Sequence, residues 1–203
     1  MDTVTLAGTA LGLAVASGLS LYGATFLTGL LIQLGWVRLV PGWEPLAVLA
    51  DPIVLTVAGA LCAVEFFADK VPWVDSAWDA IHTVIRPIGG AILASRALGD
   101  LSPPAEVIAL LLLGGVTLAT HGAMASVRLA VNASPEPVSN LLLSLTENTL
   151  VVTAVWLALT HPWLALGLGL ATVALAVTGL VWLGGRALGL LRRRWPRRST
   201  SPT

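Results

Sequence analysis

Long apolar runs separated by prolines constrain this chain more than any other feature of its sequence. Five runs, at about residues 52–69, 76–98, 105–130, 138–160 and 163–190, are long enough to cross roughly 30 Å of hydrocarbon as helices. The interruptions between them contain prolines, which commonly begin or end helices. Charged residues make up only 11% of the chain, whereas soluble domains contain about 25%. We therefore expect an all-α, multi-pass bundle of membrane helices.

Residues 4–36 form a further apolar segment, which is too long for one straight crossing and rather short for two. Its middle, residues 17–23, is rich in serine and glycine, which weaken helices. The sequence predicts a broken or re-entrant first span, although one long tilted helix with two ordinary glycines also fits. With this segment included we expect about six spans. Residues 38–51 are predicted to form an interfacial loop.

The two ends of the chain differ in charge. Residues 192–198 are rich in arginine and contain no acid, so the positive-inside rule predicts a cytoplasmic C-terminus in a bacterial cell membrane. We expect residues 1–191 to form a single transmembrane domain. Residues 192–203 are expected to be a disordered tail that contacts anionic lipids and not nucleic acid. The first residues carry no basic stretch and no convincing cleavage site, so no signal peptide is expected.

One helix is predicted to carry a polar stripe. Asp75, Asp79, His82 and Arg86 follow one another at spacings of four, three and four residues. On an α-helix these positions lie within a stripe roughly 60° wide. A charged side chain is costly in lipid, so the stripe is expected to face protein, water or a ligand. Its first two acids also fit a hydrated helix entrance that any bundle would tolerate.

A second polar face indicates an internal repeat. When the chain is aligned with itself, the matched pairs are Asp79 with Asn140, Thr83 with Ser144, and Arg86 with Glu147. Each face follows a helix with a polar end, which contains Glu65 and Asp69 in the first copy and His121 and Arg128 in the second. Many transporters place their site between such repeats. A repeat of two helix hairpins and a chance match in an apolar chain explain this alignment equally well.

The polar residues within or near the ends of the apolar runs are the candidate solute or ion pathway. They are Glu65, Asp69, Asp79, His82, Arg86, His121, Arg128, Asn140 and Glu147. Ion pairing is their simplest stable arrangement. Glu65 or Asp69 could pair with Arg86 while Glu147 pairs with Arg128, or these partners could be exchanged. Arg86 would suit a carboxylate or phosphate group, and the histidines would suit proton relay. The structural alternative is that the pairs only fix helix register.

Metal and enzyme chemistry have weaker support. Asp75, Asp79 and His82 are the metal candidates, but a metal site needs several converging ligands. The sequence contains no Walker loop, dinucleotide fingerprint, HExxH motif or serine-nucleophile elbow. We therefore predict no cofactor and favour a protein that is not an enzyme.

Four motifs carry a family resemblance. They are EFFADKVPWVD at 65–75, IRPIGG at 85–90, RLAVNASPEPVSN at 128–140 and SLTE at 144–147. Through them the chain resembles a family of small bacterial integral membrane proteins known only as a domain of unknown function. The family often has an Asp where this chain has Asn148, and a basic residue near Met124. The resemblance implies no activity.

These observations favour a small transporter or channel with a buried charged site for an anionic or proton-coupled solute. A membrane scaffold or lipid-organising protein is the first alternative, in which the charges hold helices or a homo-oligomer together. The second alternative is an intramembrane enzyme that acts on a lipid headgroup. The expected partners are the bilayer, an unidentified small solute or ion, and further copies of the chain.

Overall fold

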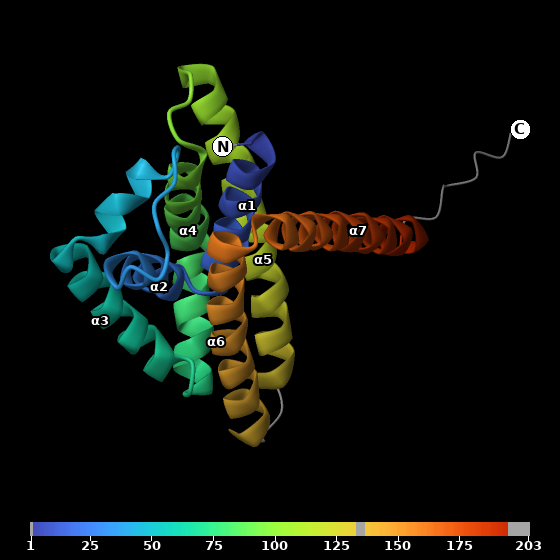
Figure 1. Cartoon of the computed structure of the whole chain (residues 1–203). Helices are drawn as coiled ribbons and strands as arrows, with labels where there is room; N and C mark the ends of the chain where they lie inside the picture. Colours follow the sequence, from blue (N-terminus) through green and yellow to red (C-terminus); the bar gives the residue numbers. More distant parts are fainter. Residues whose placement is uncertain (1, 133–136, 195–203) are drawn as a thin grey trace, which may run out of the picture.

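The structure is a computed structural model and describes residues 2–132 and 137–194. Every regular element in these ranges is helical, which confirms the all-α prediction (Figure 1). The α-helices are α1 (Thr3–Leu19), α2 (Leu21–Gln33), α3 (Pro52–Ala68), α4 (Pro72–Ser95), α5 (Pro103–Asn132), α6 (Pro137–Thr160) and α7 (Pro162–Arg194). Two 3₁₀ helices are η1 (Glu44–Ala50) and η2 (Arg96–Leu98). The predicted loop at 38–51 therefore contains a helix, η1.

The helix boundaries follow from local chemistry. Helices α3 to α7 each begin at a proline, which lacks the N–H that would be unpaired at that position. Asp51 precedes α3 and accepts a hydrogen bond from the Ile53 backbone N–H at 2.8 Å. Asp2 caps α1 in the same way, through the Thr5 N–H at 2.9 Å. The five apolar runs predicted from the sequence thus correspond to α3–α7.

Three helices in the described ranges are long and apolar enough to cross a membrane, at Pro103–Val131, Val138–Thr160 and Pro162–Gly179. The number rises to four if η1 and α3, which meet at 67°, are counted as one bent span. Helix α4 is long enough but is not among them, because its polar stripe lowers its hydropathy. The chain is therefore a helical protein with several apolar segments of membrane-spanning length.

The first apolar segment is broken, as predicted. Helix α1 ends at Leu19 and α2 begins at Leu21, with Ser20 between them in an extended conformation (φ −148°, ψ 110°). The Ser20 hydroxyl accepts a hydrogen bond from the Gly23 backbone N–H at 3.0 Å and so caps α2. Ser20 is buried, so its non-helical backbone is surrounded by protein.

Helix α1 lies at the centre of the fold and contacts α4, α5, α6 and α7. Small residues permit this close packing. A Cβ atom added to Gly8 would lie 2.1 Å from the Pro162 carbonyl oxygen, and one on Gly12 would lie 2.8 Å from the Ala158 Cβ. Helix α3 is peripheral and packs mainly on α2 (Figure 1). The position of α1 places the helix break next to the polar side chains of α3, α4 and α5.

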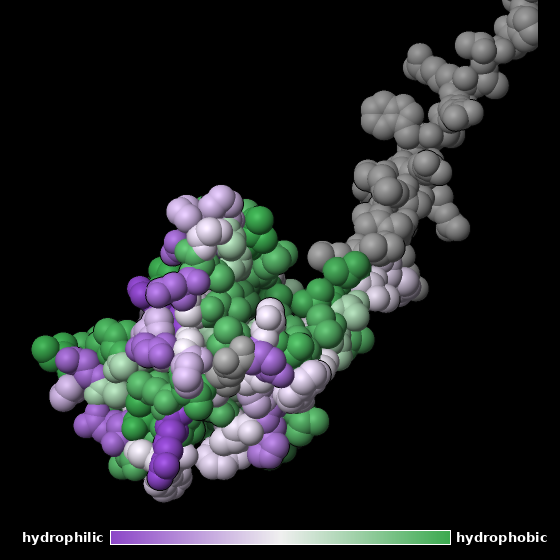
Figure 2. All heavy atoms as spheres, turned by 45° about the horizontal axis from the view of Figure 1, so that its top comes forward, coloured by the Kyte–Doolittle hydropathy of each residue, from purple (hydrophilic) through white to green (hydrophobic). Residues whose placement is uncertain are grey.

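The outer surface suits a lipid environment. Large apolar areas cover much of the face in Figure 2, and side chains such as Ile53, Leu111 and Leu175 are about three-quarters exposed, at 75%, 73% and 74%. Helix α7 extends away from α4–α6 (Figure 1) and continues to Arg194, past the boundary expected at 191. The rest of the predicted tail, residues 195–203, lies outside the described residues.

Candidate functional site

Two buried arginines organise the polar interior. Arg86 lies midway along α4 and is 1% exposed, and Arg128 lies near the end of α5 and is 3% exposed. We call the residues bound to them the Arg86 centre and the Arg128 centre. Acidic side chains from α3, α4 and α6 surround these two centres.

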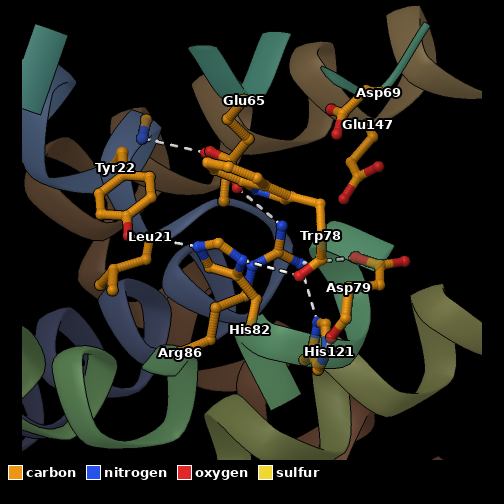
Figure 3. Close-up of polar contacts among 12 residues, drawn as sticks. Leu21, Tyr22, Glu65, Asp69, Trp78, Asp79, His82, Arg86, His121 and Glu147 are labelled. Atoms are coloured by element: carbon orange, nitrogen blue, oxygen red, sulfur yellow. Dashed lines mark hydrogen bonds and ion pairs between the residues drawn. The ribbon is translucent and has the colours of Figure 1, made fainter. Parts of the chain in front are cut away.

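The Arg86 centre is built on the helix break (Figure 3). One terminal nitrogen of Arg86 lies 2.7 Å from a Glu65 carboxylate oxygen. The other donates to the Gly18 carbonyl, in the last turn of α1, at 3.3 Å. Ser20 donates its hydroxyl to the second Glu65 oxygen. The negative C-terminal end of α1 thus faces the guanidinium, while Glu65 binds the residue that caps the positive N-terminal end of α2, so both helix dipoles stabilise the pair.

His121 completes this centre, and its neighbours fix its protonation. Its Nδ1 lies 2.8 Å from an Arg86 terminal nitrogen, which can only donate a hydrogen bond. Nδ1 must therefore be the acceptor, and the ring proton is on Nε2. Nε2 faces the Thr83 hydroxyl at 3.1 Å and the Asp79 carbonyl at 3.2 Å, both of which can accept. A second proton on this ring would face the N–H of Arg86, so His121 is held neutral.

The Arg128 centre contains more acid than base. Arg128 forms ion pairs with Asp69 at 3.1 Å, with Asp75 and with Glu147. All three carboxylates are nearly inaccessible, with 1–5% of each side chain exposed. The ion pairs connect α3, α4, α5 and α6. One guanidinium therefore holds three carboxylates, from the end of α3, from α4 and from α6, in a single cluster.

Asp79 lies between the two centres. Its Oδ1 is 3.7 Å from a terminal nitrogen of Arg86 and 3.7 Å from one of Arg128. This oxygen is buried and has no hydrogen-bond partner among the described residues. The same holds for the Arg86 Nε and for one Glu147 oxygen. The middle of the cluster therefore contains polar atoms whose hydrogen-bonding capacity is unused.

His82 lies beside this cluster in a separate group. Its Nδ1 is 2.8 Å from the Trp78 carbonyl oxygen, and its Nε2 is 3.2 Å from the Tyr22 hydroxyl. Since a carbonyl can only accept, Nδ1 carries a proton, while Nε2 faces a hydroxyl that can either donate or accept. The ring also stacks on Trp78, with centroids 4.5 Å apart (Figure 3).

Asn140 and Lys70 support the outer side of the Arg128 centre. The Asn140 side-chain amide donates to the Asp69 carbonyl at 3.1 Å. The Lys70 ammonium donates to the Phe66 carbonyl at 2.8 Å and approaches the Ser144 hydroxyl at 3.4 Å. Lys70 is half-buried, and its ammonium lies 3.2 Å from the centre of the Phe66 ring. These contacts fasten the end of α3 to α6.

The structure therefore brings most of the predicted residues together, with one correction. Asp75 does not form a hydrated helix entrance, because it is 1% exposed and paired with Arg128. Asp75, Asp79 and His82 do not converge on a common point, and no metal-binding group of three or more His, Cys or acidic residues occurs in 2–132 and 137–194. Gly18 and Ser20 were not predicted, although the weak helix at 17–23 was the signal that could have indicated them.

The cluster has an excess of acid. The buried carboxylates of the described residues are Glu65, Asp69, Asp75, Asp79 and Glu147. The buried guanidiniums are Arg86 and Arg128. His121 is neutral in the hydrogen-bonding pattern above, and Lys70, at the edge, supplies one further positive charge. Since uncompensated charges are very costly to bury, this excess of acid over base is the unusual property of the cluster.

Comparison with known proteins identifies the family of the chain. No curated protein and no solved structure matches the chain. A family model described as "Domain of unknown function (DUF4126)" matches residues 7–182. The matched region runs from α1 into α7 and includes every residue of the two arginine centres. On this match the chain belongs to the DUF4126 family.

Proposed function

We propose that this protein is a small membrane transporter in which the buried charge cluster takes up and releases protons. The observation that carries the proposal is the excess of buried carboxylates over buried guanidiniums. Intramembrane acids of this kind commonly mark ion pathways and proton relays. The excess provides a reason for protons to be bound at the cluster.

The helix break supports the same function. Transporters often build their sites from discontinuous helices, whose ends bind charged groups near the middle of the bilayer. Here the carbonyl end of α1 faces Arg86, and the capped start of α2 is linked to Glu65 through Ser20. A segment broken in this way can adjust at Ser20 without disrupting a continuous helix.

Proton coupling has more support than recognition of an anion by Arg86. The terminal nitrogens of Arg86 already bind Glu65, His121 and Gly18. An anionic solute would have to displace Glu65, which would add an unpaired acid to a cluster that already has too many. A proton on one of the carboxylates reduces that excess.

The proposed arrangement in the membrane has about six spans, with α4 shielded by its neighbours and α1–α2 forming the broken first span. In this arrangement the basic tail is cytoplasmic and the two hairpins form a repeat. We place the protein in the bacterial cytoplasmic membrane, with anionic lipid at the tail and further copies of the chain as candidate partners.

The scaffold alternative also has a specific observation in its favour. The ion pairs of Arg128 connect four helices, α3 to α6, and removing one partner of such a buried pair typically costs about 3–5 kcal/mol. In a scaffold, these pairs would hold the bundle together and would move no protons.

A flux experiment separates these functions. The full chain is reconstituted in liposomes that contain a pH-sensitive dye, and a potassium diffusion potential drives protons inward, with and without added inorganic phosphate or lactate. We expect proton entry faster than in protein-free liposomes and slowed at least tenfold by Glu147→Gln. The exposed Asp100 provides the matched control, Asp100→Asn, which should retain the flux.

Two results would refute the transport proposal. One is a wild-type flux no faster than that of protein-free liposomes under all of these conditions. The other is a flux that survives both Arg86→Ala and Glu147→Gln unchanged. Flux that requires phosphate or lactate would instead assign an anionic solute.

A further inference from the structure

Asp79 differs from the other four buried acids in its contacts. Each of the other carboxylates has an N–H donor of an arginine within hydrogen-bonding distance. Asp79 has none among the described residues, although nine-tenths of its side chain is buried. Hydrogen bonds from a guanidinium stabilise the ionised form of a carboxylate. Asp79 therefore loses the least when it becomes neutral.

Other acids as well as two guanidiniums surround Asp79, whose Oδ1 lies 3.7 Å from Arg86 and from Arg128. The titratable and charged groups around Asp79 are Glu65 of α3, Asp69 directly after α3, Asp75 and Arg86 of α4 with His82 beside them, His121 and Arg128 of α5, and Glu147 of α6. The Arg86 centre is neutral, because Glu65 balances the guanidinium and His121 carries no charge. The Arg128 centre already has three acids on one base. An ionised Asp79 would add a fourth.

We propose that Asp79 is the proton-binding residue of the pathway and that it exchanges its proton as it shifts between Arg86 and Arg128. The role of Asp79 in transport rests on the proposed function, whereas its role as a proton-binding site does not. The geometry that points to it is the position of Oδ1, which is equidistant from both guanidiniums and hydrogen-bonded to neither.

The chemical step is a proton transfer. A proton from water on one side forms an O–H bond at an Asp79 carboxylate oxygen, and the side chain changes from −1 to neutral. The neutral carboxyl is released from the attraction of both arginines. When the proton leaves to water on the other side, the O–H electron pair returns to the carboxylate, which is again drawn to a guanidinium. The two arginines stay protonated throughout.

Infrared difference spectroscopy tests the site directly. The full chain in lipid nanodiscs is titrated with acid and alkali, and the C=O stretch of protonated carboxylic acids is followed. We expect a pH-dependent band that Asp79→Asn removes and that the exposed-site control Glu106→Gln retains. Asp79→Glu should restore a band at a shifted frequency. The α-helical circular dichroism of each variant confirms that it is folded.

Two outcomes would overturn the proposal. A band that survives Asp79→Asn but disappears in Glu147→Gln would place the proton on Glu147. A spectral change that follows the sodium concentration at constant pH would assign a metal cation to the site. The infrared spectrum does not depend on flux. If Asp79→Asn removes the band but the wild-type protein moves no protons in liposomes, the transport proposal is refuted and the proton site at Asp79 is retained.

Discussion

The hydroxyl of Ser20 has two roles that a single substitution can test. It donates to Glu65 and accepts from the Gly23 N–H as the cap of α2. Replacing a serine cap with alanine costs about 1 kcal/mol, and losing a hydrogen bond to a charged group costs about 1.5–3 kcal/mol. Ser20→Ala should therefore destabilise the fold by roughly 2.5–4 kcal/mol, because both roles are lost together.

Ser17 provides the matched control for this substitution. It is also a buried serine of the same segment, but its hydroxyl only donates to the Leu13 carbonyl one turn back in α1. Since that carbonyl is already part of the helix, Ser17→Ala should cost less than about 1 kcal/mol. Equilibrium unfolding of both variants in detergent measures the difference. Equal costs for the two serines would refute the role assigned to the helix break.

Three further substitutions test other parts of the structure. Gly12→Val should sharply lower the yield of folded protein, since its Cβ would lie within 3 Å of Ala158 and Ala165. Gly115→Ala is the control and should be tolerated, because no atom lies within 4 Å of the added Cβ. The yield of solubilised, monodisperse protein in size-exclusion chromatography compares the two variants. Arg128→Gln should destabilise the fold by about 3–5 kcal/mol because it leaves buried acids unpaired. The control is Arg38→Gln, which changes an exposed arginine. If both variants unfold at the same temperature, the prediction is wrong. Tyr22→Phe removes only a 3.2 Å hydrogen bond to His82 and should cost about 1 kcal/mol or less in the same unfolding assay, so a larger loss would show that the His82 group is essential to the fold.

The sequence predicted the helices better than their arrangement. Proline positions located α3–α7, and the serine and glycine residues near Ser20 indicated the break. The central position of α1 could not be predicted, because its composition is as apolar as that of a helix facing lipid. Its burial depends on which helices it contacts, and the apolar pattern of one segment carries no such information.

The sequence indicated the membership of the polar cluster and two of its pairs, Glu65 with Arg86 and Glu147 with Arg128, but not the full set of pairs. Polar residues in apolar runs must find partners, so the sequence indicated Glu65, Arg86 and Arg128. A hydrated position was one alternative for Asp75 because it lies near a helix end, yet Asp75 pairs with Arg128 of α5. Arg86 and Glu147, which align in the proposed repeat, belong to different centres. Pairing is decided by how the helices pack, and spacing within each helix does not fix it.

The central claim is that the buried excess of acid is carried as bound protons, and the pH dependence of unfolding tests it most directly. If the folded state holds more protons than the unfolded state, its stability must fall as pH rises, by about 1.4 kcal/mol per pH unit for each extra proton. We predict a fall of at least this size in the unfolding free energy between pH 6 and pH 8. A stability that is constant or increases over this interval would contradict the claim.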